Sequence, residues 1–287
     1  NTLQTSSSIG ITLFPNDGHT PDEMLQNADS ALYEAKQSGR NRFCFFTQRM
    51  QADANRRHWI SNELGVALHR KHLSVHYQPI VDMSTMRMCG AEALLRWRHP
   101  KEGLISPDVF IPVAEQNGMI APLSQWVFKT CINDLERWQK DSSLALSLAI
   151  NLSVAQFVGK NHIEALLSLL DKSSLARSRR ITVEITESLK LSDRPEYIEV
   201  LNQFRASGCK IAIDDFGTGY SSLSYLKRIP VDIIKIDRSF VRDITTDPTD
   251  AATVRAILQI AEAFGLETVA EGVETEAQLA FLKEHGC

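Results

Sequence analysis

A buried strand that ends in two adjacent carboxylates constrains this chain most strongly. Residues 210–220 read KIAIDDFGTGY, an apolar run followed by Asp214 and Asp215 and then by two glycines. Neighbouring side chains of a strand point to opposite faces, so both acids can serve one site only if the backbone turns there. Gly217 and Gly219 permit such a turn, because glycine accepts positive φ. A divalent cation between the acids is one interpretation, and a turn cap at Asp214 with Asp215 facing water is the other.

This strand belongs to a series in which strands and helices alternate. Several of the strands are nearly continuous apolar runs, as expected for strands that are covered on both faces. Repeated units of this kind form either a doubly wound sheet or a (βα)8 barrel. The predicted strands are 73–81, 89–97, 145–151, 180–187, 210–215, 231–237 and 267–272. The predicted helices are 107–140, 162–171, 194–207, 221–228, 249–264 and 274–285.

Polar side chains lie in or at the ends of six consecutive strands. Only a barrel brings six strand ends around one centre, so the pattern favours an α/β fold of the (βα)8 type with seven strands readable. The polar residues are Glu92, Asn151, Glu184, Glu187, Asp214, Asp215, Lys235, Asp237 and Glu271. Taken one by one, each could equally be a helix cap, a solvated strand end or a member of an ion pair.

The chemical types in this set favour a hard metal ion. Oxygen ligands select Mg²⁺ or Mn²⁺ over zinc. Several carboxylates around one point require positive charge, and two ions balance them better than one. A pair of such ions suits displacement at a phosphodiester, in which a water attacks the phosphorus. Lys235 is then a cation that holds or helps to activate this water. The alternative for Lys235 is a counter-ion to Asp237 or Asp215.

Composition excludes several classes of function. The net charge of -4 provides no basic field for a DNA or RNA duplex. Five cysteines without a CxxC pair indicate neither a zinc site nor a disulfide framework, and they suit a reducing compartment. No apolar run is long enough for a membrane span. We therefore expect a cytoplasmic protein, in which any membrane anchor would lie outside this sequence.

The first 46 residues form a separate strand–helix–strand pattern. Strands are predicted at 6–14 and 41–46, and a helix begins at Thr20-Pro21-Asp22-Glu23 with a capping box and ends at Gly39. SIGITLFPNDG and QNADSALYEAKQSGRNRF resemble the C-terminal end of the GGDEF (diguanylate cyclase) family. The catalytic signature of that family would lie upstream, so no cyclase activity follows. The predicted domains are a GGDEF fragment at 1–46, a linker helix at 47–56 and a second domain at 57–287.

Motifs in residues 57–287 resemble the EAL domain family. They are Tyr77-Gln78-Pro79-Ile80, Glu92–Trp97, Asn151-Leu152-Ser153, Glu184–Ser188, Asp214–Tyr220, Lys235-Ile236-Asp237 and Ala270–Glu274. The resemblance implies a modified TIM (βα)8 barrel that hydrolyses cyclic di-GMP to linear pGpG with Mg²⁺ or Mn²⁺, and a homodimer formed through this domain. It also implies an eighth strand after Cys287.

The resemblance assigns roles residue by residue. Lys235 matches the water-activating lysine, Glu271 a glutamate beside the second metal, and Glu187 the anchor of the loop after the fifth strand. Gln78 and Arg96 match contacts to guanine and phosphate. The implied metal ligands are Glu92, Asn151, Glu184, Asp214 and Asp215.

Two other functions compete with this hypothesis. A cyclic di-GMP receptor without catalysis would use the same pocket, but such receptors are expected to lose metal ligands, and here each readable ligand is present. An enolase-type barrel would use Lys235 to abstract a proton. That hypothesis leaves Asn151 and the Asp214–Asp215 pair unexplained.

Overall fold

The chain forms two compact units. The computed structural model describes residues 5–141, 145–173, 178–187, 194–219 and 226–287. One unit comprises Asn1–Arg70 with Asp108–Ala114, and the other comprises Lys71–Pro107 with Glu115–Cys287. In these described ranges, every helix is too short or too polar to cross a membrane.

The first unit is built on a small parallel sheet. β1 (Ile9–Ile11) pairs with β2 (Phe43–Phe45), and α1 (Pro21–Gln37) packs against both strands. The predicted capping box is confirmed, because the Glu23 amide donates to Thr20 Oγ1 at 3.2 Å and the Glu23 carboxylate accepts from the Thr20 amide. α2 (Gln48–His69) then runs as one continuous helix through the segment predicted as a linker.

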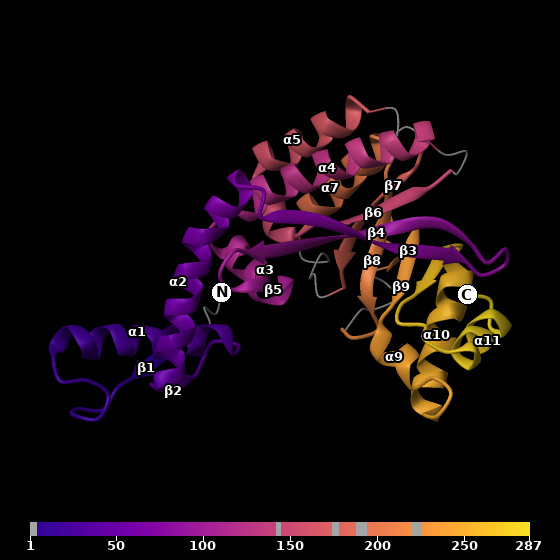
Figure 1. Cartoon of the computed structure of the whole chain (residues 1–287). Helices are drawn as coiled ribbons and strands as arrows, with labels where there is room; N and C mark the ends of the chain where they lie inside the picture. Colours follow the sequence, from indigo (N-terminus) through magenta and orange to yellow (C-terminus); the bar gives the residue numbers. More distant parts are fainter. Residues whose placement is uncertain (1–4, 142–144, 174–177, 188–193, 220–225) are drawn as a thin grey trace. The chain divides into compact units, whose positions relative to one another are not determined.

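A curled sheet forms the centre of the second unit (Figure 1). Its strand order is β10-β9-β8-β7-β6-β4-β3, in which β3 is antiparallel to β4 and every other neighbouring pair is parallel. This half-barrel confirms the predicted modified TIM barrel type. The bounds are β3 (Leu73–Asp82), β4 (Arg87–His99), β6 (Ser147–Asn151), β7 (Ile181–Thr186), β8 (Lys210–Phe216), β9 (Ile233–Ile236) and β10 (Glu267–Ala270). A short strand that the sequence did not predict, β5 (Gly103–Ile105), pairs with β4.

Helices cover the outer face of this sheet (Figure 1). They are α4 (Ile120–Asp141), α5 (Lys160–Asp171), α7 (Pro195–Ala206), α10 (Pro248–Phe264) and α11 (Glu276–Glu284), with the shorter α3 (Pro107–Gln116), η1 (Val154–Val158) and α9 (Arg238–Arg242) between elements. The long helical region predicted at 107–140 is confirmed, but it consists of two helices: α3 and α4 are separated at Gly118, whose φ of 78° does not continue a helix. Most of the helix predicted at 221–228 lies outside the described residues.

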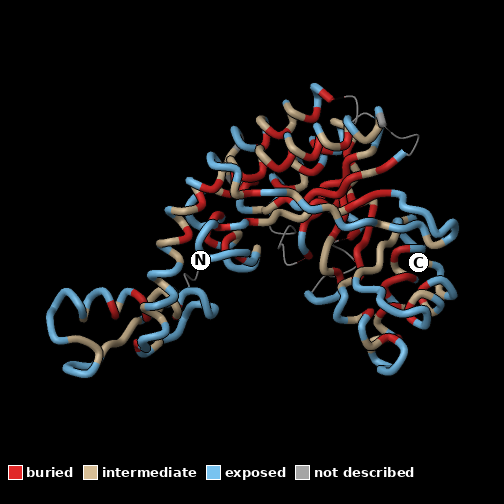
Figure 2. Tube along the Cα trace, in the orientation of Figure 1, coloured by how far each residue is buried: buried red, intermediate tan, exposed pale blue. Residues whose placement is uncertain are grey.

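The core lies between the sheet and its helices. Alternate residues of the central strands, such as Val183, Ile213 and Ile236, are at most 1% exposed. Figure 2 shows these strands buried along most of their length. Since side chains alternate along a strand, the residues between them point to the concave face. Glu184 and Lys235 occupy that face and are themselves buried.

Candidate active site

Strand register places the predicted polar residues on one face. Glu92 of β4 pairs with Gln78 of β3, Asn151 of β6 pairs with Glu184 of β7, and Thr186 of β7 pairs with Asp214 of β8. Cross-strand partners project from the same face of a sheet. The carboxyl ends of the parallel strands therefore deliver their polar side chains to one concave surface.

The ammonium of Lys235 lies at the centre of these side chains. Its Nζ is 3.0 Å from Glu92 Oε2, 3.0 Å from Glu184 Oε2, 3.1 Å from Asp214 Oδ1 and 2.7 Å from Glu271 Oε1. The lysine side chain is 3% exposed. Asn151 joins the group because its Nδ2 donates to Glu92 Oε1 at 2.9 Å. We call these six residues the acid cluster.

One ammonium does not balance the charge of the acid cluster. Burial by itself would lower the pKa of Lys235, but the surrounding carboxylates outweigh burial and raise that pKa. Burial also raises the pKa of Glu184, as do the charges of Glu92 and Asp214, although Lys235 opposes them. Burial likewise raises the pKa of Glu271. Four carboxylates around a single ammonium leave negative charge in excess when all of them are ionised.

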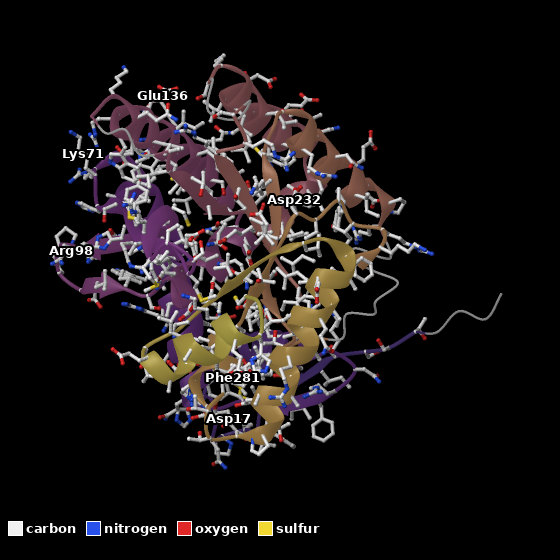
Figure 3. All side chains as sticks on the ribbon, turned by 90° about the vertical axis from the view of Figure 1, so that its right-hand side faces the viewer. Asp17, Lys71, Arg98, Glu136, Asp232 and Phe281 are labelled. Atoms are coloured by element: carbon white, nitrogen blue, oxygen red, sulfur yellow. The ribbon has the colours of Figure 1, made fainter. Side chains whose placement is uncertain are left out.

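Charges at the opposite ends of the strands are balanced differently. Asp232, labelled in Figure 3, precedes β9 and accepts hydrogen bonds from Arg179 at 2.9 Å and Arg205 at 3.2 Å. Lys210 pairs with Glu267, with Nζ 2.6 Å from Oε1. Asp232 and Glu267, at these amino ends, thus each meet at least one cation. Four carboxylates with a single ammonium between them lie instead at the carboxyl ends, where barrel enzymes carry their sites.

The predicted backbone turn lies at Asp215. Its φ is 54°, and the pairing of β8 with β9 shifts register between Ile213 and Phe216. The Asp215 amide donates to Asp214 Oδ1 at 3.0 Å. Burial, together with the charges of Asp214 and Asp237, raises the pKa of Asp215 to about 6. Asp215 therefore lies beside the acid cluster and close enough to a further acid, Asp237, for that charge to affect its pKa.

Glu187 lies apart from the acid cluster and contacts the segment after β8. Its Oε2 accepts from the amides of Gly217 at 2.6 Å and Gly219 at 3.2 Å. A Cβ on Gly219 would lie 3.1 Å from Glu187 Cδ, so a larger residue at this position would press against the Glu187 side chain. The Thr218 hydroxyl donates to the Asp215 carbonyl at 2.8 Å. The remainder of the predicted loop lies outside the described residues.

Gln78 and Arg96 flank the acid cluster on the two strands of the antiparallel pair. Gln78 is exposed and directly opposite Glu92. Arg96 is four residues beyond Glu92 on β4, and therefore on the same face, and its Nη1 donates to the Leu95 carbonyl at 3.0 Å. The sequence analysis missed one contact nearby, in which Ser153 Oγ donates to Glu115 Oε1 at 2.6 Å. Ser153 was part of a quoted motif, but nothing marked Glu115 within its helix.

The donor set of the acid cluster fits a hard cation. Carboxylate oxygens of Glu92, Glu184 and Asp214 lie within 4.8 Å of one another. Carboxylate and amide oxygens are the ligands that Mg²⁺ and Mn²⁺ prefer. The unbalanced negative charge favours a divalent ion in the same place. Together, the half-barrel and its acidic strand ends define a barrel-type α/β protein with a site suited to cation-dependent chemistry.

Comparison with known proteins identifies the family. The EAL domain family matches residues 61–287, and the diguanylate cyclase GGDEF domain family matches residues 1–42. The chain belongs to the EAL domain family and carries a GGDEF fragment before it.

Several relatives have names that describe their activity. The chain is 44% identical over 285 residues to the bifunctional diguanylate cyclase/cyclic di-GMP phosphodiesterase MucR of Pseudomonas aeruginosa, covering 99% of this chain and 42% of MucR. It is 39% identical over 284 residues to the cyclic di-GMP phosphodiesterase PdeR of Escherichia coli, covering 99% of this chain and 42% of PdeR. The chain thus spans less than half of these relatives.

Solved structures share the fold. The structure of the PaMucR phosphodiesterase in complex with c-di-GMP superposes with a TM-score of 0.75 at 42% identity, covering 80% of this chain and 92% of that one. The EAL enzyme Bd1971, bound to cAMP and cyclic di-GMP, gives a TM-score of 0.74 at 36% identity, covering 82% of this chain and 64% of that one.

Proposed function

We propose that this chain hydrolyses cyclic di-GMP to linear pGpG in the presence of Mg²⁺ or Mn²⁺. The observation that carries the proposal is the acid cluster, in which four carboxylates share one buried ammonium at the carboxyl ends of the barrel strands. The names of MucR and PdeR, and the ligand in the PaMucR structure, support cyclic di-GMP as the substrate.

The oxygen ligands suit two ions. Asp215 and Glu271 would lie beside the second ion. Two divalent ions supply charge stabilisation at the attacking and leaving oxygens of a phosphodiester and lower the pKa of a bound water. The ligands of the first ion would be Glu92, Asn151, Glu184 and Asp214.

The other side chains position the reactants. Lys235 holds the carboxylates in one geometry, and if metal ions took over some of these carboxylates, an N–H of its ammonium would be free to donate to the attacking water from a rigid strand. Arg96 lies on the same face, and its guanidinium suits a phosphate because it offers two parallel donors. The amide of Gln78 can donate to and accept from the edge of a guanine. The substrate would therefore lie over β3 and β4, with its scissile phosphate at the acid cluster.

The test is a hydrolysis assay on the whole chain. Purified protein is incubated with cyclic di-GMP and Mn²⁺, and the products are separated by chromatography. We expect pGpG to accumulate, and EDTA to stop its formation. Binding of cyclic di-GMP without any pGpG would favour the receptor, and absence of both binding and turnover would overturn the proposal for either role.

Replacing Glu187 by alanine tests the segment after β8 separately. The amides of Gly217 and Gly219 would lose their shared acceptor, and the backbone that follows Asp215 would loosen. We expect hydrolysis to fall by about tenfold or more, since a hydrogen bond to a charged group contributes about 1.5–3 kcal/mol, and about 1.4 kcal/mol corresponds to a factor of ten. Part of the activity should return at high Mn²⁺ concentration, because no ligand has been removed.

The control for Glu187→Ala is Glu136→Ala. Glu136 also accepts a hydrogen bond, from Ser173 Oγ at 2.9 Å, but it lies on α4 away from the acid cluster. Activity is measured as a function of Mn²⁺ concentration in both variants. An unchanged metal dependence in Glu187→Ala would refute the anchoring role.

A further inference from the structure

We infer that Glu115 and Ser153 are positioning residues that hold Asn151, and through it the acid cluster, in place. This inference rests on the proposed function. Ser153 lies two residues beyond Asn151, and its Oγ donates to Glu115 Oε1 at 2.6 Å. A short hydrogen bond to a carboxylate is stronger than one between neutral groups. The bond therefore ties the segment that follows β6 to helix α3.

The segment after β6 is short and is fixed at several points. The Leu152 amide donates to the Glu184 carbonyl at 2.8 Å, and the Leu152 side chain is 3% exposed. Ser153 Oγ accepts from the Ala155 amide at 3.2 Å and so caps η1. Since this hydroxyl has one proton, it donates to Glu115 while it accepts from the backbone. Ser153 thus joins η1 and α3 through a single oxygen.

The effect on the site would pass through Asn151. Its Nδ2 donates to Glu92 Oε1 at 2.9 Å, while the other oxygen of that carboxylate accepts from Lys235 at 3.0 Å. A displacement of the Asn151 backbone would break the hydrogen bond to Glu92 Oε1, and this oxygen would then no longer be held in place. Both residues are proposed ligands of the same ion, so their mutual geometry determines how tightly that ion binds.

Helix α3 gives this bond its particular place in the fold. Residues Asp108–Ala114 of the helix are assigned to the first unit, whereas its first residue, Pro107, and its last two residues, Glu115 and Gln116, are assigned to the second unit. The Glu115–Ser153 bond is therefore a connection between the C-terminal turn of α3 and the strand end that carries Asn151. The alternative explanation is that the Glu115–Ser153 bond only stabilises the fold. The metal affinity and the kinetic constants distinguish this alternative from the positioning role.

The experiment compares Glu115→Ala, Glu115→Gln, Ser153→Ala and the double variant Glu115→Ala/Ser153→Ala with the wild-type chain. The measurements are the dissociation constant of Mn²⁺ by calorimetry, kcat and KM for cyclic di-GMP, and Tm. The matched control is Ser38→Ala, which removes a similar exposed bond from Ser38 Oγ to Glu34 Oε1, 3.2 Å long, in the first unit.

We expect Glu115→Ala to weaken Mn²⁺ binding and to lower kcat, each by about three- to tenfold, the scale of one lost hydrogen bond. KM for cyclic di-GMP should hardly change. Glu115→Gln keeps an acceptor oxygen and should restore most of the loss. The double variant should be no worse in Mn²⁺ affinity than Ser153→Ala, because both changes break the same bond. Ser38→Ala should leave the Mn²⁺ affinity, kcat and KM unchanged.

Unchanged Mn²⁺ affinity and kcat in Glu115→Ala would overturn the inference, and so would fully additive losses in the double variant. A loss in Glu115→Gln equal to that in Glu115→Ala would also count against it. If the wild-type chain binds Mn²⁺ without turnover, and Glu115→Ala weakens that binding, the positioning role stands and the proposed hydrolysis fails. A wild-type chain that binds no Mn²⁺ would overturn both.

Discussion

Replacing Lys235 by methionine is expected to lower the free energy of unfolding by about 3–5 kcal/mol at neutral pH, the usual cost of leaving buried charge without its partner. Methionine retains most of the side-chain length but removes the cation that Glu92, Glu184, Asp214 and Glu271 share. Hydrolysis should also be lost. Urea denaturation at several pH values measures the effect on stability.

The pH dependence of the free energy of unfolding identifies the cause of the lost stability in Lys235→Met. The folded-state pKa of Glu184 is already raised above its ordinary value of 4.5, and removing Lys235 would raise it further. An acid with a raised folded-state pKa destabilises the protein above that pKa, and the penalty vanishes as the pH falls toward the unfolded value. Lys235→Met should therefore regain stability on acidification relative to the wild type. Mn²⁺ should restore part of it at neutral pH.

Lys210→Met is the matched control for Lys235→Met. Lys210 pairs with Glu267 at the other end of the strands, where the side chains are 24% and 62% exposed. Exposed pairs contribute at most about 1 kcal/mol, so this variant should be nearly as stable as the wild type. If the two variants lost the same free energy of unfolding, Lys235 would not be the cation on which the four carboxylates depend. A stability of Lys235→Met that does not change with pH would contradict this role as well.

Replacing Glu92 by glutamine should lower hydrolysis by at least about a hundredfold, the scale seen when a preorganised electrostatic stabiliser is lost. The variant keeps the shape of the side chain but removes one negative charge from the acid cluster, so metal ions should bind more weakly. Gln78 and Arg96 remain in place, so affinity for cyclic di-GMP should fall only modestly. Turnover is measured under saturating Mn²⁺, and the dissociation constant is measured separately with Ca²⁺.

Glu267→Gln provides the comparison for Glu92→Gln. It also replaces a carboxylate that pairs with a lysine on the same sheet, but at the amino end of its strand. Turnover should be unchanged. If Glu92→Gln hydrolyses as fast as the wild type, the catalytic role of the acid cluster is wrong, and a receptor function becomes the better hypothesis.

The sequence predicted the general position of the site better than its internal contacts. Apolar runs ended by acids are local signals, and they correctly indicated that Glu92, Asn151, Glu184, Asp214, Lys235 and Glu271 gather at one end of a half-barrel. The partners of Lys235 were not predictable. The sequence indicates Asp237 or Asp215 as possible counter-ions of Lys235. In the structure, one of its hydrogen bonds is to Glu92, which is 143 residues away in the sequence.

Other differences have local physical causes. The turn between the two acids was expected from the glycines, yet Asp215 itself has positive φ, which aspartate tolerates better than most residues. The break at Gly118 was missed because the residues on both sides are helical in pattern. Glu115 was missed because an acid near the end of a helix is common and carries no periodic signal.

Lys235 has a consequence for how such a chain matures. The ammonium of Lys235 is a monovalent counter-ion to the carboxylates of the acid cluster, and it is part of the chain itself. The barrel can therefore fold before a metal ion binds. Under the proposed function, folding and metal loading are then separate events. An arriving ion is attracted by the carboxylate charge that Lys235 leaves unbalanced, and this attraction is twice as large for a divalent ion as for a monovalent one, because Coulomb attraction scales with charge. Potassium, abundant as it is in cells, would gain only half as much there as a divalent ion.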